Sequence, residues 1–163
     1  LQQSQIQQLQ EHCKKQQLGG IIVPNFSLAA ILMMHFAATA ARFLPETNVE
    51  IIEQHHPSKA DSPSATAIRT AELIAQQKDF PLPSNGASRG QNYFNIPIHA
   101  LRLEGSIAQQ QIHFASPFES LKITHDTHNR QAFMQGLLLA CQKVLSLDHL
   151  VYGLEQLIPW HEV

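Results

Sequence analysis

The sequence predicts a two-layer α/β (α+β) domain, in which a mixed, open sheet carries helices on one face. Three observations favour this fold. The chain has 163 residues, enough for one domain with its own core. Several segments place apolar residues at helical spacing, and several others alternate apolar and polar residues or are β-branched, as strands are. No internal repeat interrupts this order.

Composition limits the classes of partner. With 44% hydrophobic residues, 15% charged residues and a net charge of -2, the chain is neither disordered nor fibrous, and it has no basic field for nucleic acid. The longest apolar stretch, Leu28 to Ala41, is too short for a membrane span, so no membrane partner is expected. Cys13 and Cys141 lie far apart, which makes a disulfide framework unexpected and favours the cytoplasm.

The first half of the chain is expected to alternate helices with strands. The pattern predicts an amphipathic helix over Gln3 to Gln16, a buried strand of parallel type over Ile21 to Val23, an interior helix from Phe26 to Leu44 capped by Asn25 or Ser27, and a strand over Val49 to His56. Pro57 to Pro63 forms a loop into the next helix. Ser62 is its N-cap candidate, and Pro63 falls near its first position.

The second half is expected to supply most of the sheet. Lys78 to Asn95 has no clear periodicity and is predicted to be a mobile excursion. Three strands are predicted, followed by a helix: Ile96 to Leu103, Ile107 to Ala115, Glu119 to His125 and the helix Asn129 to Leu145. In the middle strand, the Gln109, Gln111 and His113 face is polar, so it is half wet or meets another subunit.

The densest polar cluster, Glu53 to Thr66, falls where a strand ends and a helix begins. Proteins of this class place binding sites at such junctions. The imidazoles of His55 and His56 could line one pocket, with the Lys59 ammonium beside them. Imidazole exchanges protons near neutral pH, and a desolvated lysine near another cation has a lowered pKa. The cluster therefore suits proton donation.

The helix start that follows suits an anion. Ser64, Ala65 and Thr66 open the helix, and their backbone N–H groups with the helix dipole make a seat for a carboxylate. The implied substrate is a small anion that must be protonated. Arg102, a cation on a nearby strand, could hold a second carboxylate or have no part in binding.

Two other interpretations of the cluster stay open. His55 and His56 could simply finish a strand with satisfied hydrogen bonds, while Lys59 is solvated. A metal site is the weaker alternative and none is expected, because adjacent histidines on a strand point to opposite faces and no third His or Cys follows at ligand spacing. An unrelated hydrolase or metal protein using the two histidines is a further alternative.

The run from Glu53 to Ala67, EQHHPSKADSPSATA, resembles the signature E-x-H-H-x-x-K-x-D-x-P-S-G-T-A of the 4-hydroxy-tetrahydrodipicolinate reductase (dihydrodipicolinate reductase, DapB) family. Similarity extends over nearly the whole chain from Gly19 onward. Supporting matches are Pro24-Asn25-Phe26-Ser27, Leu32-Met33-Met34, Ile98 to Arg102, Gly105, His125, Arg130, Phe133, Gly136 and Val151-Tyr152-Gly153-Leu154.

This resemblance implies roles for individual residues. His55 would be the proton donor or acceptor, Lys59 a second proton donor and His56 a substrate contact. The carboxylate of a small dicarboxylate substrate would bind at Ser64, Ala65 and Thr66, and the hinge stretch Val23, Pro24, Asn25 and Phe26 would touch the nicotinamide of NADPH or NADH. The resemblance also implies a homotetramer acting in lysine and diaminopimelate biosynthesis.

The chain departs from the family pattern at small residues. Ala65 replaces the glycine of the signature, Ala29 replaces a glycine upstream, Phe118 replaces another before a glutamate, and Gln109 replaces a usual histidine. Alanine at a helix start keeps its N–H donor if its φ is negative, whereas a positive φ there would be strained.

The seven glycines form no G-x-G-x-x-G loop for a dinucleotide phosphate. We therefore expect a fragment without the family's Rossmann half. Residues 1–24 would be a remnant of that half plus the hinge, and residues 25–163 the C-terminal substrate-binding and oligomerisation domain. The main NAD(P)H site would lie in the missing half, so hydride transfer by this chain alone would be absent or very weak. The alternative is a non-catalytic oligomerisation module of the same family.

Overall fold

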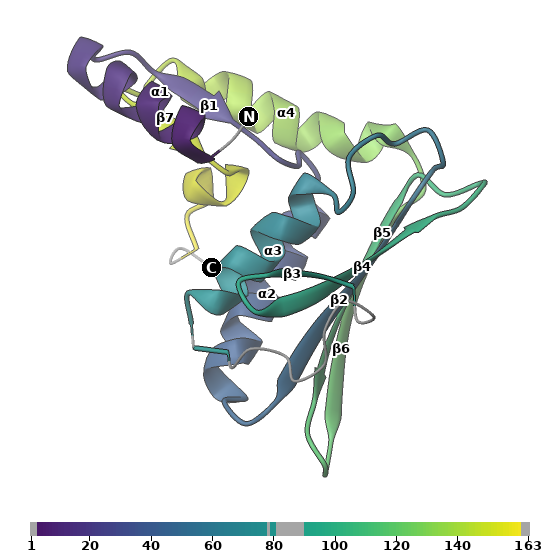
Figure 1. Cartoon of the computed structure of the whole chain (residues 1–163). Coiled ribbons are helices and arrows are strands. Elements are labelled where there is room, and N and C mark those ends of the chain that lie inside the picture. Colours follow the sequence, from purple (N-terminus) through teal and green to yellow (C-terminus); the bar gives the residue numbers. More distant parts are fainter. Residues whose placement is uncertain (1–2, 78, 81–89, 161–163) are drawn as a thin grey trace. The chain divides into compact units, whose positions relative to one another are not determined.

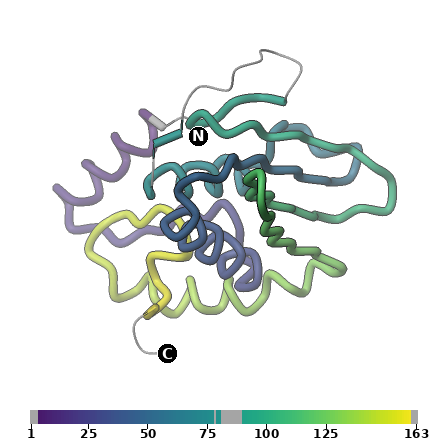
Figure 2. The backbone as a smooth tube through the Cα atoms, turned by 90° about the horizontal axis from the view of Figure 1, so that it is seen from below, coloured from purple at the N-terminus to yellow at the C-terminus, as the bar shows by residue number. Residues whose placement is uncertain are grey.

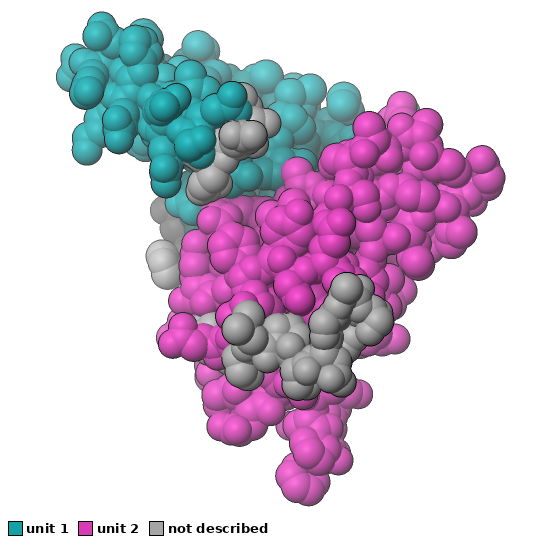
Figure 3. Space-filling model, viewed as in Figure 1, with its two compact units in different colours: residues 1–31, 131–163 teal, residues 32–130 magenta. Residues whose placement is uncertain are grey.

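A computed structural model describes residues 3–77, 79–80 and 90–160 of the chain (Figures 1 and 2). The elements are, in order, α1 (Gln3–Gln16), β1 (Gly20–Ile22), α2 (Leu28–Phe43), β2 (Asn48–His55), α3 (Ala65–Ala75), β3 (Gln91–Tyr93), β4 (Ile96–Arg102), β5 (Ala108–Ala115), β6 (Ser120–Thr127), the 3-10 helix η1 (Arg130–Phe133), α4 (Met134–Val144), β7 (Leu150–Tyr152) and the 3-10 helix η2 (Leu154–Leu157). Figure 3 shows two compact units, one of residues 1–31 and 131–163 and the other of residues 32–130.

Unit 2, residues 32–130, contains a five-stranded sheet in the order β3-β4-β2-β5-β6. Strands β2 and β4 pair in parallel, and the other neighbours pair antiparallel. Helices α2 and α3 lie on the same side of this sheet (Figure 1). The mixed, open sheet with helices on one face is therefore confirmed.

Each central strand has one buried and one partly exposed face. On β5, Gln110, Ile112 and Phe114 are buried, whereas Gln109, Gln111 and His113 are only partly buried. Alternation along a strand sends successive side chains to opposite faces, so the buried set packs under the helices. The second set lies on what we call the open face, as the sequence predicts for a half-wet surface.

Helix α2 differs from the prediction of an interior helix. Met34 and Ala37 are buried, but Leu32, Phe36 and Phe43 are 42%, 54% and 77% exposed. In a two-layer fold a helix buries one side against the sheet, so apolar residues around the rest of its surface stay accessible. Ser27 is the cap, because its Oγ accepts from the Ala30 N–H at 3.3 Å. Among the described residues no helix has the length and apolarity of a membrane span.

Unit 1 contains a small parallel sheet that the sequence did not predict in full. Strand β1 pairs with β7, with Ile21 opposite Val151. A three-residue strand is too short to show a periodicity, so the tail of the chain gave no sign of β7. Cys13 and Cys141 are both free, as expected.

The last predicted helix and the predicted excursion also differ in detail. Residues 130–133 form the 3-10 helix η1 before α4 begins at Met134. Helix α4 is part of unit 1, and the five-stranded sheet is part of unit 2. Within Lys78 to Asn95, residues 78 and 81–89 lie outside the described residues, and Gln91–Tyr93 forms the edge strand β3.

Candidate active site

A buried carboxylate lies at the end of β2. The Glu53 side chain is fully buried and accepts hydrogen bonds from Nη1 of Arg102, at 3.0 Å to Oε1 and 3.1 Å to Oε2. It also accepts from Nδ1 of His55 and, at 3.3 Å, from the backbone N–H of Ser64. Glu53 thus joins β2, β4 and the start of α3 at one point.

These contacts decide the charge of Glu53. Burial raises the pKa of its carboxyl, but hydrogen bonds and charges from His55 and Arg102 outweigh that effect, so the pKa lies below its ordinary value. The carboxylate is therefore ionised at neutral pH. An ionised, buried carboxylate needs paired donors, and the three donors of this site supply them.

The two histidines occupy different positions. His55 is the last residue of β2, and its side chain is 14% exposed. His56 follows the strand in a turn, where its carbonyl accepts from the Lys59 N–H at 3.2 Å and its Nδ1 lies 2.8 Å from Oγ of Ser58. Both rings have hydrogen-bond partners, as the interpretation of a simple strand end also expects.

Lys59 has a carboxylate partner, not the cationic neighbour that the sequence suggested. Its Nζ lies 2.6 Å from Oδ1 of Asp61. Burial raises the pKa of the Asp61 carboxyl, but the Lys59 ammonium and the backbone N–H groups of Asp61 and Ala65 together hold that pKa below its usual value. Lys59, the predicted second proton donor, and Ala65, a predicted substrate-binding residue, therefore meet at one carboxylate.

The start of α3 corrects the predicted cap. Ser64, not Ser62, is the N-cap: its φ is -67°, and its Oγ accepts from the Ala67 N–H at 3.2 Å. The helix begins at Ala65, because the hydroxyl of Ser64 reaches the N–H three residues ahead, as an N-cap must. Pro63 consequently precedes the cap instead of opening the helix.

Ala65 is not among the residues with positive φ. The methyl group that replaces the glycine of the signature therefore adds no backbone strain, and the N–H of Ala65 is kept as a donor. Thr66 follows it as the second helical residue, and its carbonyl accepts from Oγ1 of Thr70 at 2.8 Å. The departure from the family pattern leaves the helix start intact.

Arg102 was left open by the sequence, and Glu53 and Asp61 were not predicted as partners. Arg102 pairs with Glu53 through Nη1 and donates from Nη2 to the backbone carbonyl of Asp61 at 2.6 Å. The contact between Arg102 and Glu53 could have been predicted from one feature of the sequence. Strand alternation places Glu53 on the buried face with Val49 and Ile51, and a buried carboxylate needs a cation on a neighbouring strand.

The predicted hinge residues Val23, Pro24, Asn25 and Phe26 belong to unit 1, whereas all the groups above belong to unit 2. They link β1 to α2 and are partly buried. Oδ1 of Asn25 accepts from the Ser27 N–H at 2.8 Å, which shapes the entry into α2.

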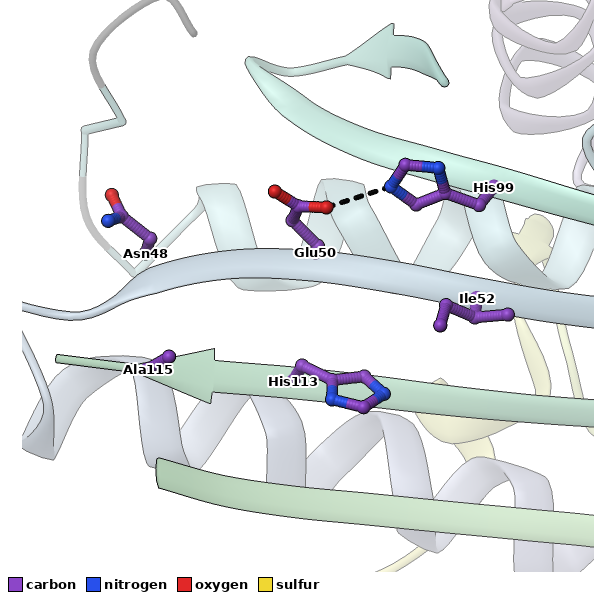
Figure 4. Close-up of a pocket in the computed structure, with 6 residues that line it drawn as sticks. All are labelled: Asn48, Glu50, Ile52, His99, His113 and Ala115. Atoms are coloured by element: carbon purple, nitrogen blue, oxygen red, sulfur yellow. Dashed lines mark hydrogen bonds and ion pairs between the residues drawn. The ribbon is translucent and has the colours of Figure 1, made fainter. Parts of the chain in front are cut away.

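A second feature lies on the open face of the sheet (Figure 4). It is a hollow of about 530 Å³ lined by Asn48, Glu50, Ile52, His99, His113 and Ala115. Nε2 of His99 lies 2.8 Å from Oε2 of Glu50. Burial and the Lys122 charge lower the pKa of His113. Residues 3–77, 79–80 and 90–160 contain no group of three or more His, Cys, Asp or Glu that could hold a metal ion.

Comparisons with known proteins all point to one family. The family model described as "Dihydrodipicolinate reductase, C-terminus" matches residues 29–158. A protein of Legionella pneumophila named 4-hydroxy-tetrahydrodipicolinate reductase is 49% identical over 96% of this chain and 66% of its own length. Proteins of the same name from Moorella thermoacetica and Coxiella burnetii are each 46% identical, over 95% and 94% of this chain and 60% and 64% of their own lengths.

Among solved structures, the dipicolinate-bound dihydrodipicolinate reductase of Paenisporosarcina sp. TG-14 matches with a TM-score of 0.73 and 40% identity, over 97% of this chain and 62% of that one. The chain thus spans about two-thirds or less of the length of these relatives. The family model matches most of the chain, and the matched region includes the junction of β2 and α3 that carries the signature from Glu53 to Ala67. The chain belongs to the dihydrodipicolinate reductase family, of which it carries the C-terminal region.

Proposed function

We propose that this chain is the substrate-binding and proton-donating part of a 4-hydroxy-tetrahydrodipicolinate reductase, an NAD(P)H-dependent enzyme of lysine and diaminopimelate biosynthesis. One observation carries the proposal. Arg102 contacts both the carboxylate of Glu53 and the backbone carbonyl of Asp61. The Glu53 carboxylate accepts hydrogen bonds from His55 and from the Ser64 N–H. The Asp61 carboxylate contacts the Lys59 ammonium and the Ala65 N–H. The donors of the signature therefore converge on one place.

In this proposal the carboxylate of a cyclic dicarboxylate substrate binds at Ser64, Ala65 and Thr66. The helix dipole and the backbone N–H groups at the start of α3 favour an anion there. His56 contacts the substrate, and His55 exchanges a proton with it. Lys59 donates a second proton. The dipicolinate in the Paenisporosarcina structure is a dicarboxylate, which agrees with this substrate class.

NADH or NADPH, when bound, supplies the hydride that the substrate ring accepts. The sequence contains no glycine-rich phosphate loop, so this chain fits only the nicotinamide end of the cofactor. Val23, Pro24, Asn25 and Phe26 are the residues proposed to touch it. A preceding Rossmann half would bind the rest, with residues 1–24 as its remnant and hinge, and hydride transfer without that half would be absent or very weak.

The open face of the sheet is proposed to be the surface through which the chain assembles, as a homotetramer in the cytoplasm. Its supporting features are the hollow and the exposed Leu101 of β4, which lies opposite Gln54 on the same face. An apolar and amide-rich sheet face of this kind gains free energy when it is covered.

The test of the reductase function uses the protein extended by its upstream half. Oxidation of NADH or NADPH is measured with the substrate of 4-hydroxy-tetrahydrodipicolinate reductases. We expect substrate-dependent oxidation, and we expect His55→Gln to lower kcat about 100-fold or more, because general acid–base catalysis contributes that much. The Kd for dipicolinate should change much less. His12→Gln removes an exposed imidazole of α1 and is the matched control.

Full turnover in His55→Gln contradicts the proton-exchange role. No turnover in the extended protein, combined with intact assembly, favours the non-catalytic oligomerisation module instead.

A further inference from the structure

We propose that Glu53 is a positioning residue that fixes the imidazole of His55 with its proton on Nδ1 and so reserves Nε2 for proton exchange. The part of this inference that concerns turnover rests on the reductase function proposed above for His55. The part that concerns the ring of His55 stands on the contacts of unit 2 alone.

The first argument is geometric. Glu53 and His55 are two positions apart on β2, so both side chains project to the same face of the sheet. Nδ1 of His55 is in hydrogen-bond contact with Oε2 of Glu53. The carboxylate cannot move to release the ring, because Arg102 holds both of its oxygens and the Ser64 N–H holds Oε1.

The second argument is the charge of the carboxylate. An ionised carboxylate only accepts hydrogen bonds, so the nitrogen that faces it must carry a proton. Burial raises the pKa of the Glu53 carboxyl, but hydrogen bonds and charges from His55 and Arg102 hold that pKa below its ordinary value, so the fully buried group is ionised. Neutral His55 is therefore protonated at Nδ1 and has a lone pair at Nε2. When the ring becomes cationic, the proton that it exchanges is the one on Nε2.

Arg102 has a further effect on this pair. A fully buried carboxylate with no cation beside it would be an uncompensated charge, which is strongly destabilising. The guanidinium of Arg102 at 3.0 Å compensates the charge of Glu53, so that the carboxylate orients the ring without acting as an uncompensated anion.

A second Glu–His pair, which joins β2 to β4, shows what sets this one apart. Glu50 contacts His99 through Nε2, on the open face, and both side chains are about 30% exposed. Glu50→Gln is therefore a matched control, since it changes a glutamate of β2 that is paired with a histidine of β4 and does not contact His55.

Nitrogen-15 NMR of the imidazoles in this chain tests the inference directly. At a pH where histidines are neutral, His55 should show protonated Nδ1 and unprotonated Nε2. In Glu53→Gln a single amide oxygen must serve Arg102, Ser64 and His55, so protonated Nε2 should appear at His55. Glu50→Gln should change the signals of His99 and leave those of His55 as they are.

Two results overturn the proposal: protonated Nε2 at His55 in the unmodified chain, or an unchanged Nδ1 tautomer in a folded Glu53→Gln variant. The first needs no variant, so the test survives if Glu53→Gln does not fold. Arg102→Lys gives a second check, because it keeps a cation beside Glu53 and should keep the Nδ1 tautomer at His55.

In the extended, active protein, Glu53→Gln should lower kcat about 10- to 100-fold, within what general acid–base catalysis provides, with little change in KM. A merely structural role would instead reduce the amount of folded enzyme and leave the tautomer and the kcat of the folded fraction unchanged. If the extended protein has no reductase activity but the tautomer is as stated, the proposed function fails and the positioning of His55 by Glu53 stands.

Discussion

At the scale of single residues, the carboxylate of Asp61 contacts Lys59, the predicted second proton donor, and Ala65, a predicted contact of the substrate carboxylate. It contacts Nζ of Lys59 at 2.6 Å and accepts from the Ala65 N–H, and it is 52% exposed. An ion pair with one partner so open to solvent is worth little, so an incoming anion can displace it. We therefore predict that Asp61 competes with an anionic ligand for Lys59.

This competition predicts the effect of removing the charge. In Asp61→Asn the Lys59 ammonium is free to meet an anion, while the amide oxygen can still accept from the Ala65 N–H. We expect the affinity for dipicolinate to rise about two- to fivefold, the range of an exposed ion pair. Isothermal titration calorimetry on the extended protein measures it.

Asp148→Asn removes the same charge from an exposed carboxyl of unit 1 and serves as the control. A loss of affinity in Asp61→Asn, with Asp148→Asn unchanged, would mean that Asp61 holds Lys59 in place for the ligand instead of competing with it.

At the scale of elements, α4 and the hinge stretch of unit 1 approach each other closely at one glycine. A Cβ at Gly136 would lie 1.9 Å from the backbone oxygen of Phe26 and 2.8 Å from its carbonyl carbon. Backbone atoms cannot move aside as a flexible side chain can. The packing of α4 on the segment proposed to touch the nicotinamide therefore requires a glycine at position 136.

We expect Gly136→Ala to destabilise the protein by about 1–3 kcal/mol, as overpacking of a tight contact does. This expected loss is the net value after the gain of about 1 kcal/mol that alanine brings to a helix interior, because a clash with backbone atoms costs more than ordinary overpacking. Urea unfolding followed by circular dichroism measures the difference. Gln135→Ala, at an exposed neighbouring position, should stay within about 0.5 kcal/mol of the unmodified chain. Equal stability of the two variants would refute the close approach.

At the scale of the whole molecule, the sheet of unit 2 has one face under helices and one face open. The open face holds Ile52 beside the hollow, with Gln111 opposite it on β5. A second copy of the chain could pack against a surface of this composition, in agreement with the proposed tetramer.

Sedimentation velocity at tens of micromolar should show this chain as an oligomer. Ile52→Lys would bury an unpaired charge in the interface, so it should shift the chain to smaller species. Leu145→Lys, which changes a leucine that is 90% exposed in unit 1, is the control. A clean monomer of the unmodified chain under these conditions would count against assembly through the open face.

Much of the fold followed from the sequence because its signals are local. The strands of the five-stranded sheet, except the three-residue β3, were predicted from period-two alternation and apolar runs. Helices α1 and α2 were predicted from helical spacing. The junction of β2 and α3 was predicted for the same reason, since the histidines and the helix cap lie within a few positions of one another. The choice between Ser62 and Ser64 was missed, because both serines suit an N-cap and geometry alone selects one.

The sequence by itself determined the class of fold, the family and the location of the polar cluster. Only the tertiary structure decided which charges meet there. Glu53 and Arg102 are 49 positions apart, and they face each other because β2 and β4 pair in parallel with His55 opposite Arg102. Likewise β1 pairs with β7, although the two strands are separated by most of the sequence. Such contacts depend on strand order and register, which no local pattern encodes, because the free energy that selects them arises from packing between distant segments.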